Sequence, residues 1–159
     1  MFPPSRNLLI LLAAAGSAAL LAGALAFQHI GGLAPCQLCL EQRYPHMVAV
    51  GLGVLALLIP AGYLSRLLPM AGALSAVTTA ALGAYHTGVE RDWWEGPTTC
   101  TSGSVSGLSA KDLLARIQAA PVVQCDQVAW QMFGLSMASW NMLAALLLAL
   151  IWVWAARKA

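Results

Sequence analysis

The sequence LLILLAAAGSAALLAGALAF, residues 8–27, is an unbroken apolar run that follows the basic residue Arg6. A helix needs about 20 apolar residues, each rising about 1.5 Å, to cross a hydrocarbon core of roughly 30 Å. We therefore predict a transmembrane helix. A cleaved signal peptide is the alternative, because Arg6 forms a basic flank and Ala24-Leu25-Ala26 resembles a small-residue cleavage site. The run is longer than the apolar region of a signal peptide, about 7–15 residues, which favours the membrane helix.

The chain as a whole is also strongly apolar. It has 60% hydrophobic and 9% charged residues, whereas about a quarter of the residues of a soluble domain are charged. Three further apolar runs predict spans at about 46–64, 67–86 and 140–155. Within the first of these, the helix should end at about Ile59, because Pro60-Ala61-Gly62 marks a break or kink. The expected fold is therefore an all-α membrane protein, a four-transmembrane-helix bundle that forms a single domain over residues 1–159. The net charge of +2, without a basic run interleaved with aromatic residues, excludes nucleic acid as a partner.

Small residues recur on one face of two predicted helices. Small side chains let helix backbones approach closely within a membrane, so these rows predict helix–helix contacts. The six tryptophans lie near predicted membrane boundaries, as in the aromatic belts of membrane proteins. The small residues are Gly72, Ala76, Thr79 and Gly83 in the third span and Gly16, Ala19 and Gly23 in the first; the tryptophans are Trp93, Trp94, Trp130, Trp140, Trp152 and Trp154.

The charged residues predict the orientation of the bundle. The two loops that hold the cysteines, at about 28–45 and 87–139, contain all six acidic residues. The termini and the middle turn carry basic residues without an acidic one: Arg6, Arg66, Arg157 and Lys158. Short basic segments of this kind face the cytoplasm. We therefore expect both termini in the cytoplasm and both cysteine loops on the opposite, oxidising side.

The four cysteines form an even set. Cys36 and Cys39 make a Cys-x-x-Cys pair in the first loop, with Arg43 four residues further on, and Cys100 and Cys125 lie in the second loop. Four cysteines allow three pairings, and on an oxidising side the leading interpretation is two disulfides, Cys36–Cys39 and Cys100–Cys125. The second bridge would stabilise its loop by about 3 kcal/mol if its role were structural. The first bridges too little chain for that, and a nearby cation commonly lowers the pKa of such thiols, which indicates a redox site.

Two metal-centred alternatives remain open. A four-cysteine zinc site is disfavoured, because the chain has one Cys-x-x-Cys pair rather than two. His46 and His86 are candidates for haem ligands on facing helices, although lone histidines near a membrane edge often only form hydrogen bonds. We therefore assign no metal ligand.

The second loop carries two further features. Glu90, Asp92 and Glu95 are interpreted as a solvated acidic stretch rather than a catalytic carboxylate pair. Ser109 followed by Asp112 resembles a helix cap, and the apolar residues after it fall on one face. We therefore predict a short helix in this loop that lies along the membrane surface.

Several short motifs form a recognisable set. They are Cys36-Gln37-Leu38-Cys39, Gln42-Arg43-Tyr44-Pro45, Tyr85-His86-Thr87, Cys125-Asp126, Trp130, Phe133-Gly134-Leu135 and Trp140. Together with the four-span plan and the two cysteine loops, they resemble the bacterial disulfide bond formation protein B family, DsbB, over nearly the whole chain. The resemblance implies a quinone-dependent protein-dithiol oxidoreductase of the bacterial inner membrane. Such an enzyme would reoxidise a periplasmic thioredoxin-fold oxidase of the DsbA type and pass the electrons to ubiquinone or menaquinone.

The resemblance also implies a role for each cysteine. The partner's thiolate would attack Cys100, with Cys125 as the other half of that bridge. Cys125 would then exchange with Cys36 and leave Cys39 as the thiolate that faces the quinone. Arg43 would stabilise this thiolate and polarise a quinone carbonyl, because a guanidinium stays protonated. An interfacial anchor is the alternative role for Arg43.

Two other residues bear on this resemblance. His86 matches a family position near the quinone, where it would hydrogen-bond the quinone or relay a proton; a helix-end hydrogen bond is the alternative. Glu41 departs from the best-known family pattern, because an acid directly after Cys39-Leu40 would offset Arg43 and raise the pKa of the thiolate. Two other functions stay open: a non-enzymatic membrane scaffold stapled by disulfides or zinc, and a vitamin K epoxide reductase-like enzyme, although the chain lacks that family's cassette in a late span.

Overall fold

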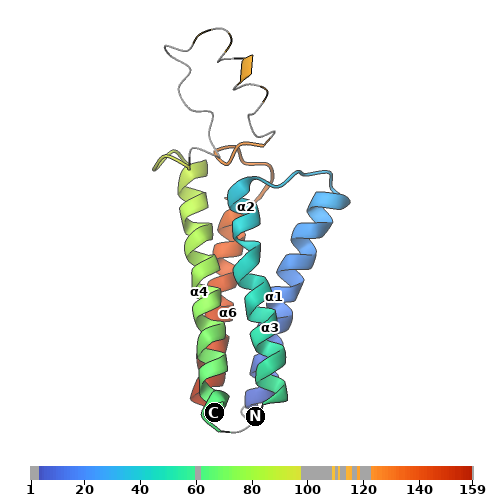
Figure 1. Ribbon diagram of the computed structural model, residues 1–159, viewed down its shortest axis with the longest axis vertical. Helices are drawn as coiled ribbons and strands as arrows, with labels where there is room; N and C mark the ends of the chain where they lie inside the picture. The colour runs from blue at the N-terminus through green and yellow to red at the C-terminus, as the bar shows by residue number, and fades with distance from the viewer. Residues whose placement is uncertain are drawn as a thin grey trace.

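Four long helices run side by side in the computed structural model, which describes residues 4–59, 62–97 and 123–158 together with positions 109, 111, 114, 115 and 118. The long helices are α1 (Arg6–His29), α3 (Arg43–Leu58), α4 (Leu64–Glu90) and α6 (Met137–Arg157); the short elements are α2 (Gln37–Glu41), β1 (Gln131–Met132) and β2 (Leu135–Ser136). They form a ring, in which α1 and α4 each pack against α3 and α6 (Figure 1). The described part of the chain is therefore an all-helical bundle with one small hairpin.

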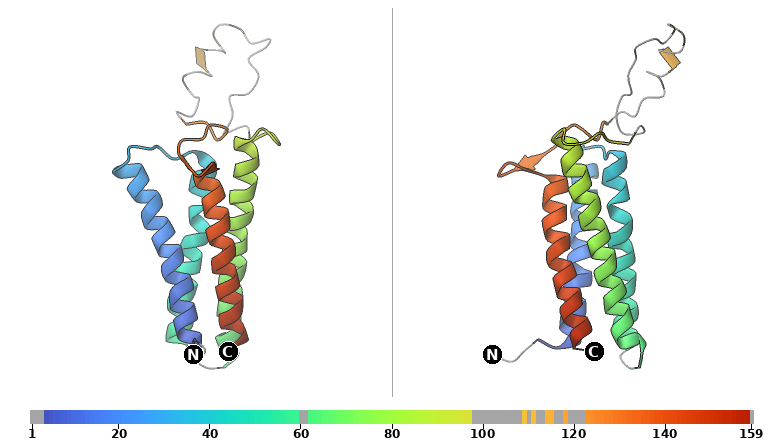
Figure 2. Two further views of the ribbon diagram at one scale, coloured as in Figure 1. Left: turned by 180° about the vertical axis from the view of Figure 1, so that it is seen from behind. Right: turned by 90° about the vertical axis from the view of Figure 1, so that its left-hand side faces the viewer.

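The two ends of the bundle differ. The start of α1 and the end of α6 lie at one end, and α2 lies at the other (Figures 1 and 2). At the terminal end, the Arg6 guanidinium holds α1 by donating to the carbonyl oxygens of Ser65, at 3.0 Å, and Ala56, at 3.3 Å. Towards the α2 end, α1 leans away from its neighbours (Figure 1). The bundle is therefore closed at its base and splayed on the side of the cysteines.

Three helices, α1, α4 and α6, are long and apolar enough to cross a membrane. The other long helix, α3, has only 16 residues and ends at Leu58, close to the helix end predicted at Ile59 and short of the outer bound of the span at residue 64. Ile59 leaves the helix with ψ of 82°, as a residue that precedes a proline is expected to do. In contrast, α4 extends beyond the third predicted span of 67–86 at both ends. Its last turn is buried, and such packing stabilises a helix beyond its intrinsic preference.

The row of small residues on α4 packs against α6, as the sequence predicts. A methyl group on Gly72 would lie 2.7 Å from the ring of Trp152, and one on Gly83 would lie 2.9 Å from the carbonyl oxygen of Ala138. Trp152 is fully buried and packs in the core with Ile10. The ring therefore packs inside the bundle, where the missing side chain of Gly72 leaves room for it.

A tight hairpin precedes α6. Met132 of β1 pairs with Leu135 of β2 in antiparallel register. The two residues between them, Phe133 and Gly134, have positive φ angles of 53° and 76°, as a two-residue turn of type I′ requires. The surface helix predicted from Ser109 onward falls mostly on residues outside the described part of the chain.

Candidate redox site

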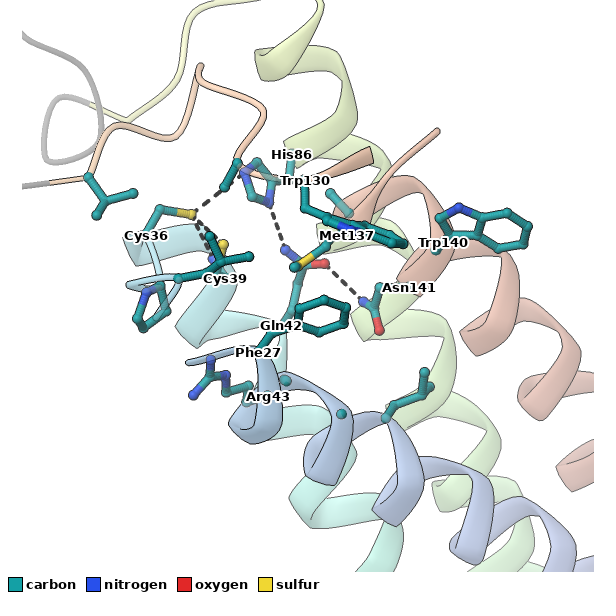
Figure 3. Close-up of a pocket in the computed structure, with 18 of the residues that line it drawn as sticks. Phe27, Cys36, Cys39, Gln42, Arg43, His86, Trp130, Met137, Trp140 and Asn141 are labelled. Carbon is teal, nitrogen blue, oxygen red and sulfur yellow. Dashed lines mark hydrogen bonds between the residues drawn. The ribbon is translucent and has the colours of Figure 1, made fainter. Parts of the chain in front are cut away.

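Cys36 and Cys39 lie in contact at the first turn of α2 (Figure 3). Cys36 Sγ accepts the backbone N–H of Cys39 at 3.2 Å, and this cap starts the helix within the loop. The two sulfur atoms are 2.7 Å apart, and both cysteines are free. The structure therefore differs from the predicted Cys36–Cys39 disulfide: it holds the pair as two neighbouring thiols.

One hydrogen bond joins the two sulfur atoms, and it makes the pKa values of the two thiols differ. The Cys36 thiol donates to Cys39 Sγ, and this bond raises the pKa of Cys36 and lowers the pKa of Cys39. Burial adds to the rise at Cys36 and opposes the fall at Cys39, where the hydrogen bond outweighs it and the charge of Arg43 adds to the lowering. Cys39 therefore carries the negative charge when one proton has left the pair.

A third cysteine, Cys125, is disulfide-bonded and lies beside Cys36. It is fully buried and packs in one cluster with Cys36, Leu38 and Val89. Cys125 is disulfide-bonded, whereas Cys100 lies outside the described residues. The bond also argues against a four-cysteine zinc site, since zinc binds cysteine as a free thiolate.

A cavity of about 330 Å³ adjoins the two thiols at the splayed end of the bundle (Figure 3). Cys36, Cys39, Arg43 and His86 all contribute to its wall. The structure therefore brings together four of the residues that the sequence predicts for the site. The opposite walls come from α1 and α6, through residues such as Gly23, Phe27 and Asn141.

Arg43 and His86 approach the cassette from two different helices. Arg43 Nη1 donates to Gln28 Oε1 on α1 at 2.8 Å, while its Nε is buried and has no hydrogen-bond partner in the described part of the chain. His86 Nε2 lies 3.6 Å from Cys36 Sγ. The imidazole therefore contacts the first cysteine of the pair as well as the cavity.

Glu90 is a site residue that the sequence analysis placed wrongly. Its side chain is only 6% exposed and lines the cavity, whereas Asp92 and Glu95 are exposed as predicted. One carboxylate oxygen lies 3.9 Å from His86 Nε2, and the other is buried without a partner among the described residues. The spacing carried a signal, because Glu90 follows His86 by four residues and shares its helical face once α4 continues that far.

Glu41 does not act as predicted. Its Oε1 accepts a hydrogen bond from Gln37 Nε2 at 3.1 Å on the exposed side of α2. The negative charge that raises the pKa of Cys39 belongs instead to Glu90. The acid that opposes Arg43 therefore comes from α4 and not from the cassette itself.

A buried polar chain connects three helices behind the cassette. Gln42 Nε2 lies 2.9 Å from His86 Nδ1, Asn141 Nδ2 donates to Gln42 Oε1 at 2.9 Å, and His46 Nε2 lies 2.9 Å from Asn141 Oδ1. The sequence analysis missed Gln42 and Asn141 as site residues and weighed His46 only as a haem ligand. A single asparagine inside an apolar span was the available signal, because polar residues in membrane helices commonly mark functional sites.

Comparisons with known proteins identify the family of the chain. The sequence model of the family described as "Disulfide bond formation protein DsbB" matches residues 6–155. Curated proteins named "Disulfide bond formation protein B" include one from Azoarcus sp. (strain BH72), 33% identical over 160 residues, covering 93% of this chain and 92% of that protein. Another, from Stutzerimonas stutzeri (strain A1501), is 29% identical over 157 residues, covering 92% and 91% of the two chains.

A third relative of the same name, from Methylococcus capsulatus, is 33% identical over 148 residues, covering 90% of this chain and 89% of that protein. No solved structure matches the chain. The family match spans both cysteine loops and all four long helices. The chain therefore belongs to the DsbB family of disulfide bond formation proteins.

Proposed function

We propose that the protein reoxidises a periplasmic DsbA-like oxidase of thioredoxin fold and passes the electrons to a membrane quinone, ubiquinone or menaquinone, in the bacterial inner membrane. One observation carries the proposal: Cys36 packs in one cluster with the disulfide-bonded Cys125, and together with Cys39 it lines a cavity of about 330 Å³. A thiol pair in this place can exchange disulfides with a protein loop and electrons with a small molecule.

The proposed relay runs through all four cysteines. The partner's thiolate attacks the sulfur of Cys100, and Cys125 leaves with the electron pair of the broken bond. Cys125 then attacks Cys36 of the oxidised cassette, and Cys39 leaves as a thiolate. A thiol of low pKa leaves faster, so the lowered pKa of Cys39 supports its place at the end of the relay.

The cavity has groups that suit a quinone head. Its volume falls within the range of roughly 300–1,000 Å³ that is usual for small-molecule sites. Arg43 Nε is a buried donor without a partner in the described chain, which suits a carbonyl oxygen, and His46 Nδ1 is an equally unpartnered acceptor, which suits the hydroxyl of the reduced form. Phe27 and Trp130, with ring centroids 5.2 Å apart, add aromatic surface. A bound quinone would supply an acceptor for two electrons and two protons.

We also propose that α3 crosses the membrane as a fourth span beside α1, α4 and α6. Its 16 residues cover about 24 Å, which approaches the hydrocarbon thickness of roughly 30 Å. Arg6, Arg66, Arg157 and Lys158 then lie on the cytoplasmic side with both termini, and the cysteine loops lie in the periplasm.

The proposal is tested by quinone-dependent reoxidation of a reduced thioredoxin-fold partner with the purified protein in detergent. The unmodified protein should reoxidise the partner and reduce quinone in equal amounts. Each cysteine changed to serine should abolish steady-state turnover, and full turnover by the Cys39→Ser variant would overturn the electron path. The assay also separates the alternatives, since a scaffold reduces no quinone and a vitamin K epoxide reductase-like enzyme differs in the direction of electron flow.

A further inference from the structure

Two backbone carbonyls fix which atoms donate and which accept in the hydrogen bonds that link the buried polar side chains. Thr79 Oγ1 lies 2.9 Å from the carbonyl oxygen of Gln42, which can only accept, so the Thr79 hydroxyl donates. Thr79 Oγ1 in turn accepts from Asn141 Nδ2 at 3.2 Å. This places the amide nitrogen of Asn141 on the side of Gln42, where it also donates to Gln42 Oε1 at 2.9 Å.

The second carbonyl fixes the Gln42 side chain independently. Gln42 Nε2 donates to the carbonyl oxygen of Leu38 at 3.0 Å, so the amide nitrogen must lie on that side. Its other hydrogen points at His86 Nδ1, 2.9 Å away (Figure 3). His86 Nδ1 is therefore an acceptor, and the single N–H hydrogen of the neutral ring is on Nε2.

The Nε2 hydrogen of His86 lies between two acceptors, the sulfur of Cys36 and the backbone of Cys125, to which the ring also hydrogen-bonds. Cys36 Sγ lies 3.6 Å from Nε2, and the other ionisable group that faces this nitrogen, the Glu90 carboxylate, lies 3.9 Å away. His86 is 3% exposed and Gln42 is 6% exposed, so bulk water offers little competition for these bonds. A hydrogen bond to a charged atom is stronger in such a site than in water.

We propose that Gln42 and Asn141 are positioning residues, which hold His86 as a fixed Nε2–H donor that the sulfur of Cys36 shares with the backbone of Cys125. The inference rests on the proposed role of Cys36 as a redox thiol. When another thiolate of the relay attacks Cys125 in a Cys36–Cys125 disulfide, the Cys36 sulfur leaves with the electron pair of the broken bond. The His86 N–H stabilises this negative charge, and no proton is transferred from the ring.

The same assignment decides against a metal at this place. The donor atoms of Cys36, Cys39 and His86 all lie within 4.8 Å of one another, a spacing that a metal ion could bridge. A histidine nitrogen ligates a metal only through a free lone pair, and here Nε2 carries the hydrogen. The cluster therefore serves to place a hydrogen-bond donor beside two thiols.

The tautomer can be measured directly in the reduced, full-length protein with ¹⁵N-histidine labelling and NMR, without quinone or partner. The His86 signal is assigned by its loss in the His86→Asn variant. We expect an unprotonated Nδ1 and a protonated Nε2 throughout the neutral pH range. A hydrogen on Nδ1, alone or together with one on Nε2, would overturn the inference.

Two variants of Gln42 extend this test. Gln42→Glu places an acceptor opposite Nδ1, so His86 should gain a hydrogen on Nδ1, whereas Gln131→Glu, on the exposed strand β1, should leave the His86 signal unchanged. In a Cys39→Ser background, Gln42→Met should slow the alkylation of Cys36 at neutral pH roughly tenfold, because the fixed donor to the thiolate is lost. An unchanged rate in a variant with unaltered helix content would contradict the positioning role.

These outcomes are separate from the proposed function. A protein that reduces no quinone but shows the expected tautomer would sink the proposed function and leave the positioning of His86 standing. A protein that turns over normally but carries a hydrogen on His86 Nδ1 would overturn the positioning of His86 and leave the proposed function standing.

Discussion

At the scale of single residues, two opposite charges act on Cys39. Arg43 lowers the pKa of this thiol and Glu90 raises it, while the larger effect is the hydrogen bond from Cys36. Both charged side chains line the same cavity as the sulfur. The acidity of Cys39 is therefore set by three different helices, since Cys36 caps α2, Arg43 begins α3 and Glu90 ends α4.

Replacing Glu90 by glutamine should lower the pKa of Cys39, because a negative charge that disfavours the thiolate is removed while the shape of the side chain is kept. The thiolate would then persist to lower pH than in the unmodified protein. The measurement is the rate of Cys39 alkylation against pH in the reduced protein. Glu95→Gln, which removes an equal charge from an exposed position, should leave the profile in place. A shift to higher pH in the Glu90 variant would contradict this account.

Replacing Arg43 by methionine should have the opposite effect on Cys39 and should also weaken quinone binding. The pKa of Cys39 should rise, because the cation that favours its thiolate is lost. The unpartnered Nε donor is lost as well, so we expect the apparent quinone affinity to fall by roughly tenfold, the effect of one hydrogen bond to a charged group. Arg91→Met, an exposed arginine over the Trp93 ring, is the control. An unchanged affinity would return Arg43 to the role of interfacial anchor.

The sequence identifies some of these residues because they lie in short contiguous motifs. Cys36, Cys39 and Arg43 are within eight positions of one another, so their proximity follows from the chain itself. Asn141 meets Gln42 across 99 positions, and no local pattern predicts such a contact. Glu90 was missed for a different reason: whether it is solvated or buried depends on where α4 ends.

At the scale of elements, the contact between α4 and α6 is built on missing side chains. Gly72 and Gly83 let α6 approach, and the ring of Trp152 fills the space at Gly72. The periodic row of small residues made this contact predictable, although it did not name the partner helix. Pro60 also made the end of α3 near Ile59 predictable. The added last turn of α4 was not predictable, because it depends on burial.

Changing Gly72 to alanine should destabilise the bundle. The added methyl group would lie 2.7 Å from the Trp152 ring, and overpacking of this kind costs about 1–3 kcal/mol. The thermal unfolding midpoint in detergent should therefore fall. Gly51→Ala is the matched control, because a methyl group at Gly51 meets nothing within 4 Å and alanine is the better helix former. An equal change in both variants would show that the Gly72 contact carries no packing energy.

At the scale of the whole molecule, the bundle separates a plain end from a chemical end. The start of α1, the end of α6 and the start of α4 lie at one end, and α2 with the cassette and the cavity lies at the other (Figures 1 and 3). Cys125 packs with Cys36 at that second end. Along the sequence, all six acidic residues fall in the two cysteine loops, whereas the eight basic residues divide equally between these loops and the remaining segments. The lean of α1 away from its neighbours shapes one wall of the cavity. No pattern in the sequence predicts this lean.

The proposed orientation can be tested with two single cysteines in a variant that lacks the four natural ones. Tyr63 is 81% exposed at the plain end, and Phe133 is 88% exposed at the chemical end. A membrane-impermeant thiol reagent added to cells with a permeabilised outer membrane should label Phe133→Cys and should leave Tyr63→Cys unlabelled until the inner membrane is opened. Labelling in the reverse order would place the cysteine loops in the cytoplasm.

The lean of α1 also determines which ligand concentration matters for the cavity, that in the lipid or that in the water. The α1 wall of the cavity is made of residues such as Leu20, Gly23 and Phe27, which belong to a helix long and apolar enough to cross the bilayer. A molecule admitted on this side is drawn from a two-dimensional solution in the lipid rather than from water. Its apparent affinity should then follow its mole fraction in the membrane, so that adding inert lipid would slow the enzyme while the aqueous volume has no effect.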